Sequence, residues 1–523
     1  MGAVSRAAWL VALGAVCALS IHPHLAWSQG TGSADPADDD EGAGSGSGSS
    51  SALVAPPAPA RKPWLTNLLT RSQTARPLLG RARIGVAVKD LVTGEELFAS
   101  NADTKLNLAS NTKLLTSIAA LGLLGNGFRW RTAVLAEHPA DETGTITGDL
   151  YIRGKGDPLL SAANLDGIAA ALVARGIRSI EGRIVLDTGY FDGVVEPPHF
   201  DEQPKERAGF RAPVASLGVA RSSITVVVVA DPGGGATVTL EPETGGYYVI
   251  TKREVTSVTE GRTRLRVETK TKRDHIEVEV TGIIRAGEGS WDLRRRVDDP
   301  ARFAGEVFRH ALGEHGISVR QKSIGMGTVP LTAKVLAIHD SQPLPDVLRF
   351  MNKTSDNYVA ESVLKTLGAE TRTTPAPATW ADGQNAVRSY LARLGLMPGS
   401  YRADNGSGLF ASTEVSARQV VTLLAAAHKD YRIGPDLLST LPIGGVDGTL
   451  AKRWLGHPAR GRVRAKTGTL DKVVTIAGYI AADSGHPLAF AILLNDVPPG
   501  QRSLARAMMD EMVDALAAYL GAT

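Results

Sequence analysis

The stretch Asn107-Leu-Ala-Ser-Asn-Thr-Lys-Leu-Leu-Thr-Ser-Ile-Ala-Ala-Leu121 sets a serine and a lysine three positions apart at the start of an apolar pattern. Apolar residues recur at helical spacing until Gly125, so a helix is predicted with Ser110 at its N-terminus. Ser110 and Lys113 then share one face of the first turn, where their side chains can touch. A lysine that is neutral part of the time can take the serine proton, and burial or a nearby cation favours that neutral form. On its own the pair is weak evidence, because most such pairs are simply exposed helix positions.

Antiparallel strands are predicted on both sides of this stretch. Residues 84–88 and 96–98 flank a turn and predict a hairpin near the start of the globular part. Three consecutive strands and an amphipathic helix are predicted near the end, at residues 461–466, 473–480, 488–494 and 504–520. The order is that of an antiparallel sheet backed by helices.

The middle of the chain changes character twice. Residues 144–329 carry short alternating runs, such as 224–229 and 276–280, and predict a large β-rich insertion. Helical spacing returns afterwards, at residues 344–353, 358–367 and 386–394. The predicted fold is therefore α+β: a catalytic domain formed by residues 63–143 and 330–523, with a sheet flanked by helices, a helical subdomain and the inserted β-rich region.

The N-terminal residues predict export. Arg6, the apolar run 7–20 and the small residues around Ser28 have the order of a secretory signal peptide over residues 1–28. Residues 29–62 are rich in Gly, Ser, Pro and Ala and predict a disordered linker. We expect a periplasmic enzyme without a transmembrane span in the mature chain; an uncleaved N-terminus would give peripheral membrane association. A lipid anchor on Cys17 is disfavoured because Val16 precedes it.

Composition excludes several classes of function. The only cysteine of the 523 residues lies in the predicted signal, so a covalent nucleophile of the mature chain must be an oxygen. The formal charge of +3 gives no strong preference for nucleic acid. The histidines lack metal-ligand spacing and no P-loop is present, so neither a metal nor another cofactor is predicted.

Two further short segments carry chemistry. Ser355-Asp-Asn357 follows a predicted helix and supplies a hydroxyl and an amide that can relay a proton and hold a substrate. Lys466-Thr-Gly-Thr469 ends a predicted strand, where a lysine and hydroxyls can bind a carboxylate and glycine leaves room for a substrate backbone. Taken separately, the first is equally typical of a helix cap and the second of an ordinary strand.

Together, in this order, the three segments resemble the serine penicillin-recognising enzymes, whose motifs read S-x-x-K, S-x-N and K-T-G. The long gap between the first two motifs narrows the resemblance to the class C low-molecular-mass penicillin-binding proteins, as do residues 156–158, 403–409 and 444–449. This family implies a D-alanyl-D-alanine carboxypeptidase or endopeptidase that acts on the stem peptides of peptidoglycan and is acylated by β-lactams. The balance between the two activities and the oligomeric state are left open.

The resemblance also implies a role for each matching residue. Ser110 would be the acylated nucleophile and Lys113 its general base, and Asn357 would hold the substrate peptide. Ser355 and Lys466 would pass a proton to the leaving amine. Thr467, Gly468 and Thr469 would line the substrate site, the two threonines binding a terminal carboxylate, and the N–H groups of Ser110 and Thr469 would form an oxyanion hole. Asp157 would meet the amine of a substrate side chain, or would be an ordinary turn residue before Pro158.

Two alternatives share these motifs. A non-catalytic peptidoglycan-binding scaffold would keep the fold without the chemistry, but all the predicted catalytic residues are present. A slow β-lactamase-like hydrolase would use the same motifs; class A β-lactamases, however, have a much shorter gap between Lys113 and Ser355 than this chain has. The carboxypeptidase or endopeptidase is the favoured interpretation.

Overall fold

The computed structural model describes residues 53–410 and 413–521 of the chain. The predicted signal peptide and most of the predicted linker lie outside these residues. Helix α1 (Ala58–Thr74) begins inside the range expected for the linker, with prolines near its start. Proline is compatible with the first turn of a helix because the N–H groups there have no intrahelical acceptor.

A five-stranded antiparallel sheet organises the catalytic domain, in the order β19-β20-β21-β1-β2. Its strands are β1 (Arg83–Asp90), β2 (Glu96–Ser100), β19 (Val463–Leu470), β20 (Val473–Ala481) and β21 (Pro487–Asn495). The predicted hairpin and the three predicted C-terminal strands are therefore present, and β1 joins them into one sheet by pairing with β21. Segments near the beginning and near the end of the described residues therefore pair in this sheet.

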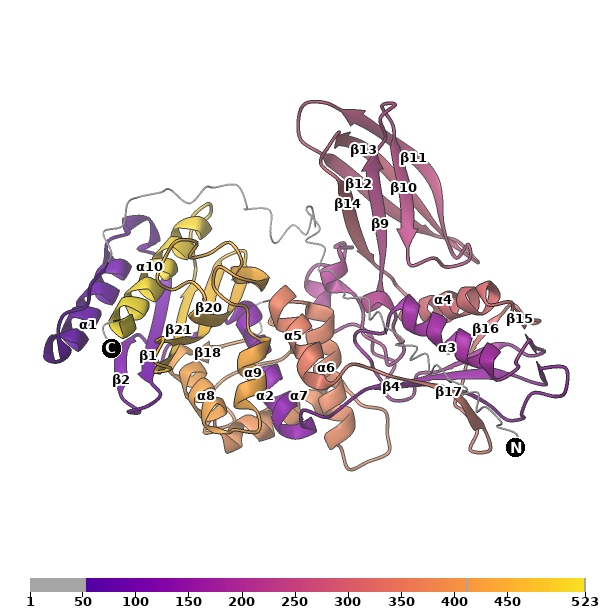
Figure 1. Ribbon diagram of the computed structural model, residues 1–523, viewed down its shortest axis with the longest axis horizontal. Coiled ribbons are helices and arrows are strands. Elements are labelled where there is room, and N and C mark those ends of the chain that lie inside the picture. Colours follow the sequence, from indigo (N-terminus) through magenta and orange to yellow (C-terminus); the bar gives the residue numbers. More distant parts are fainter. Residues whose placement is uncertain (1–52, 411–412, 522–523) are drawn as a thin grey trace, which may run out of the picture.

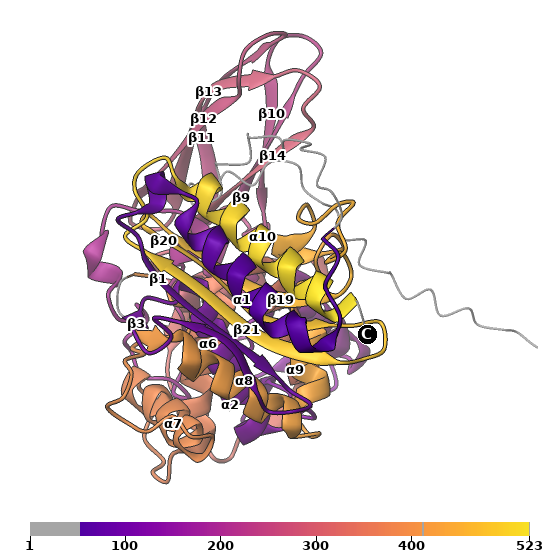
Figure 2. The same cartoon turned by 90° about the vertical axis from the view of Figure 1, so that its left-hand side faces the viewer.

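Helices cover both faces of the sheet. The C-terminal helix α10 (Arg502–Gly521) lies beside α1 on one face, and α8 (Ala417–Lys429) packs on the other (Figure 2). Successive residues of β1 serve both faces, because side chains alternate along a strand. Val86 packs in the cluster that includes Met508 of α10, whereas Ala87 belongs to the cluster under α8. Burial on both sides makes the sheet a rigid support.

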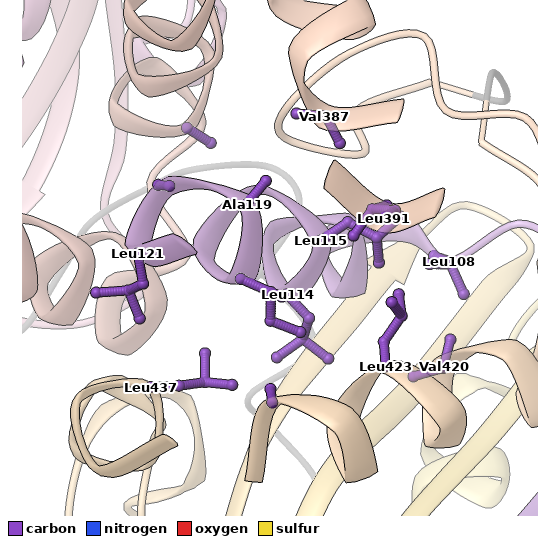
Figure 3. Close-up of a cluster of buried hydrophobic side chains, with 14 of the residues drawn as sticks. Leu108, Leu114, Leu115, Ala119, Leu121, Val387, Leu391, Val420, Leu423 and Leu437 are labelled. Atoms are coloured by element: carbon purple, nitrogen blue, oxygen red, sulfur yellow. The ribbon is translucent and has the colours of Figure 1, made fainter. Parts of the chain in front are cut away.

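Helix α2 (Thr112–Leu124) is the centre of the helical subdomain. All its residues from Thr112 to Leu121 are buried, and Figure 3 shows its leucines among side chains such as Leu391, Leu423 and Leu437 of the surrounding helices. Those helices are α5 (Leu344–Thr354), α6 (Asn357–Thr371), α7 (Trp380–Arg393), α8 and α9 (Gly434–Thr440). Surrounded in this way, the first turn of α2 carries polar side chains into the interior.

The long segment between α2 and α5 forms a separate layered region (Figure 1). Its main sheet has the order β16-β8-β6-β4-β17, and two three-stranded sheets, β10-β9-β14 and β11-β13-β12, project from it. The strands of the main sheet are β4 (Arg131–Ala136), β6 (Leu150–Gly154), β8 (Ile184–Asp187), β16 (Ile324–Met326) and β17 (Lys334–Asp340). Those of the projecting sheets are β9 (Ser223–Ala230), β10 (Ala236–Glu241), β11 (Tyr248–Val258), β12 (Arg264–Thr271), β13 (Ile276–Arg285) and β14 (Ser290–Arg296).

This region also contains two helices that the strand-like texture of the sequence concealed. Helix α3 (Ala162–Ala174) begins with a capping box between Ser161 and Asn164, and α4 (Pro300–Glu314) is capped by Asp299. Both cap signals are legible in the sequence. The alternating runs around them outweighed these signals in the prediction.

Strands β4 and β17 pair with each other at the edge of the insertion's main sheet. The sheet therefore includes residues beyond the predicted limits of 144 and 329, and the division of the chain into domains stays a prediction. The remaining strands are short: β3 (Lys105–Leu106), β5 (Thr145–Ile146), β7 (Ser179–Ile180), β15 (Ser318–Val319) and β18 (Val415–Ser416). Within residues 53–410 and 413–521, every helix is too short or too polar to cross a lipid bilayer.

Candidate active site

Ser110 lies where a tight turn enters α2. A 3₁₀ turn over Ala109–Asn111 precedes the helix, and Ala109 has a φ of +47°. The Asn107 side chain accepts the Ala109 N–H at 2.7 Å, and the Asn495 side chain of β21 accepts the Asn107 N–H at 2.8 Å. These bonds offset the cost of a left-handed alanine, a conformation common at functional sites. Ser110 is left partly exposed at the edge of the sheet.

Lys113 lies beside Ser110, as the spacing predicts, and is completely buried. Its amine donates to Ser110 Oγ at 3.1 Å, to Asn357 Oδ1 at 2.7 Å and to the Ser407 carbonyl at 2.9 Å. Burial lowers the pKa of Lys113 from its usual value near 10.5 to about 7, although the negative charges of Glu361 and Asp356 oppose that fall. A substantial fraction of this amine is therefore neutral near pH 7, as a general base requires.

Ser355 ends α5 in a left-handed conformation with a φ of +60°. Its hydroxyl oxygen accepts a hydrogen bond from Lys466 Nζ at 2.9 Å, and Lys466 also donates to the Thr467 carbonyl at 2.8 Å. Lys466 comes from β19 and is fully buried. The second and third motifs, separated by more than a hundred residues, thus meet through one amine.

Asn357 is the first residue of α6 and joins the first motif to the second. Its amide oxygen accepts from Lys113, and its amide nitrogen donates to the Phe210 carbonyl at 3.3 Å. Phe210 belongs to the insertion, so that region reaches the edge of the site. The Asn357 side chain is oriented from both sides.

Asp356, between the two predicted catalytic residues of its motif, is held by the insertion. Its carboxylate caps α6 by accepting the Val359 N–H at 3.0 Å, accepts from Arg221 at 2.8 Å and lies 3.7 Å from the Arg294 guanidinium. Burial alone would raise the pKa of Asp356, yet the two guanidinium groups lower it below its usual value. This carboxylate is therefore ionised at neutral pH and is electrostatically satisfied.

The third motif lies in β19, close to the backbone of Ser110. A Cβ on Gly468 would lie 3.0 Å from the Ser110 nitrogen and 2.7 Å from the Leu108 carbonyl, so only glycine lets β19 approach so closely. Thr467 Oγ1 bonds to Thr449 Oγ1 at 2.9 Å, and Thr469 follows on the same strand. Gly468 therefore packs against the backbone of Ser110, and Thr467 and Thr469 flank it in β19.

Asp157 has a different setting. Its side chain is only 2% exposed; it accepts the Leu159 N–H at 3.0 Å and lies 3.5 Å from His339 of β17. These contacts are those of a turn residue. The contacts described for Asp157 include none with Ser110, Ser355 or Lys466, and its contact with substrate stays a prediction.

Glu361, Ser407 and Thr449 are among the residues around the site that had no role assigned from the sequence. Ser407 and Thr449 belong to segments that carry the family resemblance. The resemblance marked these segments as important but did not indicate which residues they contact. Glu361 follows Asn357 by four residues, the spacing that places two side chains on one helix face. That spacing could have identified it once Asn357 was suspected.

Comparisons with known proteins point to one enzyme family. A model of the D-Ala-D-Ala carboxypeptidase 3 (S13) family matches residues 67–519. The D-alanyl-D-alanine carboxypeptidase of Actinomadura sp. (strain R39) is 34% identical over 461 residues, which cover 85% of this chain and 83% of that protein. The D-alanyl-D-alanine carboxypeptidase DacB of Haemophilus influenzae is 27% identical over 429 residues, covering 80% and 86%. The crystal structure of penicillin binding protein 4 (dacB) from Haemophilus influenzae has a TM-score of 0.69 at 24% identity and covers 86% of this chain and 98% of its own.

These matches confirm the predicted α+β fold and the predicted enzyme class, a serine-type D-Ala-D-Ala carboxypeptidase. The family acts on the cell wall, which implies a location outside the cytoplasm. A match that runs from α1 almost to the end of α10 shows that this chain belongs to the D-Ala-D-Ala carboxypeptidase 3 (S13) family.

Proposed function

We propose that Ser110 is the nucleophile with which this enzyme removes the terminal D-alanine from peptidoglycan stem peptides, and that β-lactams acylate the same oxygen. The observation that carries the proposal is the contact between Ser110 Oγ and the buried amine of Lys113, at 3.1 Å. The enzyme would work in the periplasm, in keeping with the signal-like N-terminus.

In the proposed acylation, neutral Lys113 takes the proton of Ser110 as Oγ attacks the carbonyl carbon of the scissile bond. The carbonyl becomes an oxyanion, which the N–H groups of Ser110 and Thr469 would stabilise; one such donor is typically worth about 3–4 kcal/mol. The C–N bond then breaks as Ser355, supported by Lys466, delivers its hydroxyl proton to the leaving amine and receives in exchange the proton that Lys113 took from Ser110. Water hydrolyses the acyl-enzyme in the second half of the cycle and restores Ser110.

The remaining site residues would bind the substrate. Asn357 would hold the peptide chain, and Thr467 and Thr469 would bind the terminal carboxylate, beside the space that Gly468 leaves. Asp157 would act on a substrate side chain only if the substrate displaces its contact with His339. Carboxypeptidase and endopeptidase reactions share this acyl-enzyme and differ in the amine that leaves.

A fluorescent penicillin tests the proposal directly. The wild-type protein should become covalently labelled on Ser110, and Ser110→Ala should not. Ser72→Ala in α1, on the far side of the sheet, is the matched control and should label normally. Incubation with pentapeptide and with cross-linked muropeptide fragments then measures release of D-alanine and cleavage of cross-links separately. A folded wild-type protein that takes up no label would contradict the proposal.

A further inference from the structure

Glu361 is a buried acid for which the catalytic scheme has no use. It lies in α6 one turn beyond Asn357, and only 1% of its surface is exposed. A carboxylate in such a place is costly unless hydrogen bonds and charge compensate it. The contacts of Glu361 must therefore supply this compensation.

Both oxygens of this carboxylate bind one peptide turn. Oε2 accepts the Gly406 N–H at 3.0 Å, and Oε1 accepts the Ser407 N–H at 2.8 Å. The same turn is fastened to α2 from its other side, because Thr116 Oγ1 donates to the Gly406 carbonyl at 2.8 Å. A Cβ on Gly406 would lie 2.6 Å from the Ala360 carbonyl, so the turn packs directly on α6.

The Gly406–Ser407 turn also holds the general base, Lys113. The Ser407 carbonyl accepts from Lys113 Nζ at 2.9 Å, and Asn357, on the same face of α6 as Glu361, accepts from it at 2.7 Å. With these two acceptors occupied, the third direction of the amine points to Ser110 Oγ. One helix thus sets two of the three bonds of Lys113, one directly and one through Glu361.

Charge acts in addition to geometry. Glu361 and Asp356 are the two anions that raise the pKa of Lys113 against the effect of burial. Arg221 and Arg294 of the insertion face Asp356 and balance its charge, and Lys466 of β19 bonds to Ser355 across the site. Burial raises the pKa of Glu361, whereas its hydrogen bonds to the 406–407 turn and the charge of Lys113 oppose that rise. Lys113, when it is protonated, is thus the cation that faces the Glu361 carboxyl group.

We propose that Glu361 is a positioning residue for the reaction: its carboxylate fixes the Gly406–Ser407 turn and stabilises the protonated amine, and so aims Lys113 at Ser110. This inference rests on the proposed role of Ser110 and Lys113. Glu361 touches neither substrate nor the reacting oxygen, so its effect must be seen through Lys113.

The test is the pH dependence of β-lactam acylation in Glu361→Gln. Acylation requires neutral Lys113 and declines at low pH as the amine takes up a proton. Removing the negative charge destabilises the protonated amine, so the acid limb should move to lower pH by about one unit. The plateau rate should fall about tenfold, because the side-chain NH2 of the glutamine would face an N–H group of the Gly406–Ser407 turn and could not accept its hydrogen bond. Glu370→Gln, at the exposed end of the same helix, should keep both the limb and the plateau of the wild type.

The outcomes separate the two proposals. If the wild type is not acylated, the proposed function fails. If the wild type is acylated and Glu361→Gln keeps an unshifted acid limb, Glu361 has only a structural role and this inference is wrong. Should Glu361→Gln fail to fold, Thr116→Val loosens the same turn without changing a charge. Thr116→Val should acylate more slowly than the wild type, while the midpoint of the acid limb stays at the wild-type pH. A plateau rate equal to that of the wild type would overturn the inference.

Discussion

Lys466 Nζ lies 2.9 Å from Ser355 Oγ, so a strand of the central sheet and the end of a helix meet at one hydrogen bond inside the site. Lys466 is fully buried, and Ser355 is held in a left-handed conformation that directs its hydroxyl toward this amine. A hydrogen bond donated by an amine to a serine hydroxyl oxygen favours transfer of the hydroxyl proton to a neighbouring acceptor. This contact supports the proposed route of the proton to the leaving amine.

We expect Ser355→Ala to slow acylation by a β-lactam by about a hundredfold, because the relay between Lys466 and the leaving nitrogen is removed. Stopped-flow measurement of acylation gives the rate. Thr354→Ala, one residue earlier and exposed, is the matched control and should acylate at the wild-type rate. A Ser355→Ala enzyme as fast as the control would exclude Ser355 from the relay.

The rate of acylation should rise with pH through a midpoint near the Lys113 pKa of about 7. The sign follows from the role of the residue: the neutral amine is the base, so protonation at low pH removes activity. Acylation rates measured across the pH range in a buffer of constant ionic strength would show the midpoint. A rate that stays flat down to about pH 5 would mean that another group accepts the Ser110 proton.

Gly468→Ala should abolish most of the acylation. The added Cβ would lie 2.3 Å from Thr475 Oγ1, 2.7 Å from the Leu108 carbonyl and 3.0 Å from the Ser110 nitrogen, so β19 must move away from the nucleophile. A displacement of about 1 Å in an active site can cost about a hundredfold in rate. Gly167→Ala, in helix α3 with open space around its Cβ, should keep full activity, and equal labelling of both variants would count against this packing.

Arg221→Met should destabilise the fold and slow acylation together. Asp356 is buried and would retain only the more distant Arg294 as a cationic partner, so we expect a loss of about 1–3 kcal/mol in the free energy of unfolding. Urea unfolding followed by circular dichroism measures that loss. Arg320→Met removes an exposed pair with Glu181 and should change stability by less than about 0.5 kcal/mol. A wild-type unfolding curve for Arg221→Met would show that Asp356 does not depend on this contact.

Local patterns predicted the strands of the central sheet well, because alternation and helical spacing are written in short windows. The predictions failed where the dominant pattern of a segment hides a weaker one. The strand-like texture of residues 144–329 concealed α3 and α4, and the low complexity before residue 62 concealed the start of α1. Strands β4 and β17 were not assigned to the insertion because their pairing spans about two hundred residues.

The chemistry divides in the same way. Ser110 and Lys113 are brought together by one turn of helix, so their contact was predictable from three-residue spacing. The sequence also supplied Ser355, Asn357, Lys466 and Gly468 as candidates with their elements. Which of these groups meet, and how deeply they are buried, follows from packing alone. Lys113 receives its two fixing acceptors from residues 357 and 407, and its low pKa arises because α2 is enclosed on all sides. Desolvation and contacts between distant segments belong to the folded chain as a whole, and no local pattern encodes them.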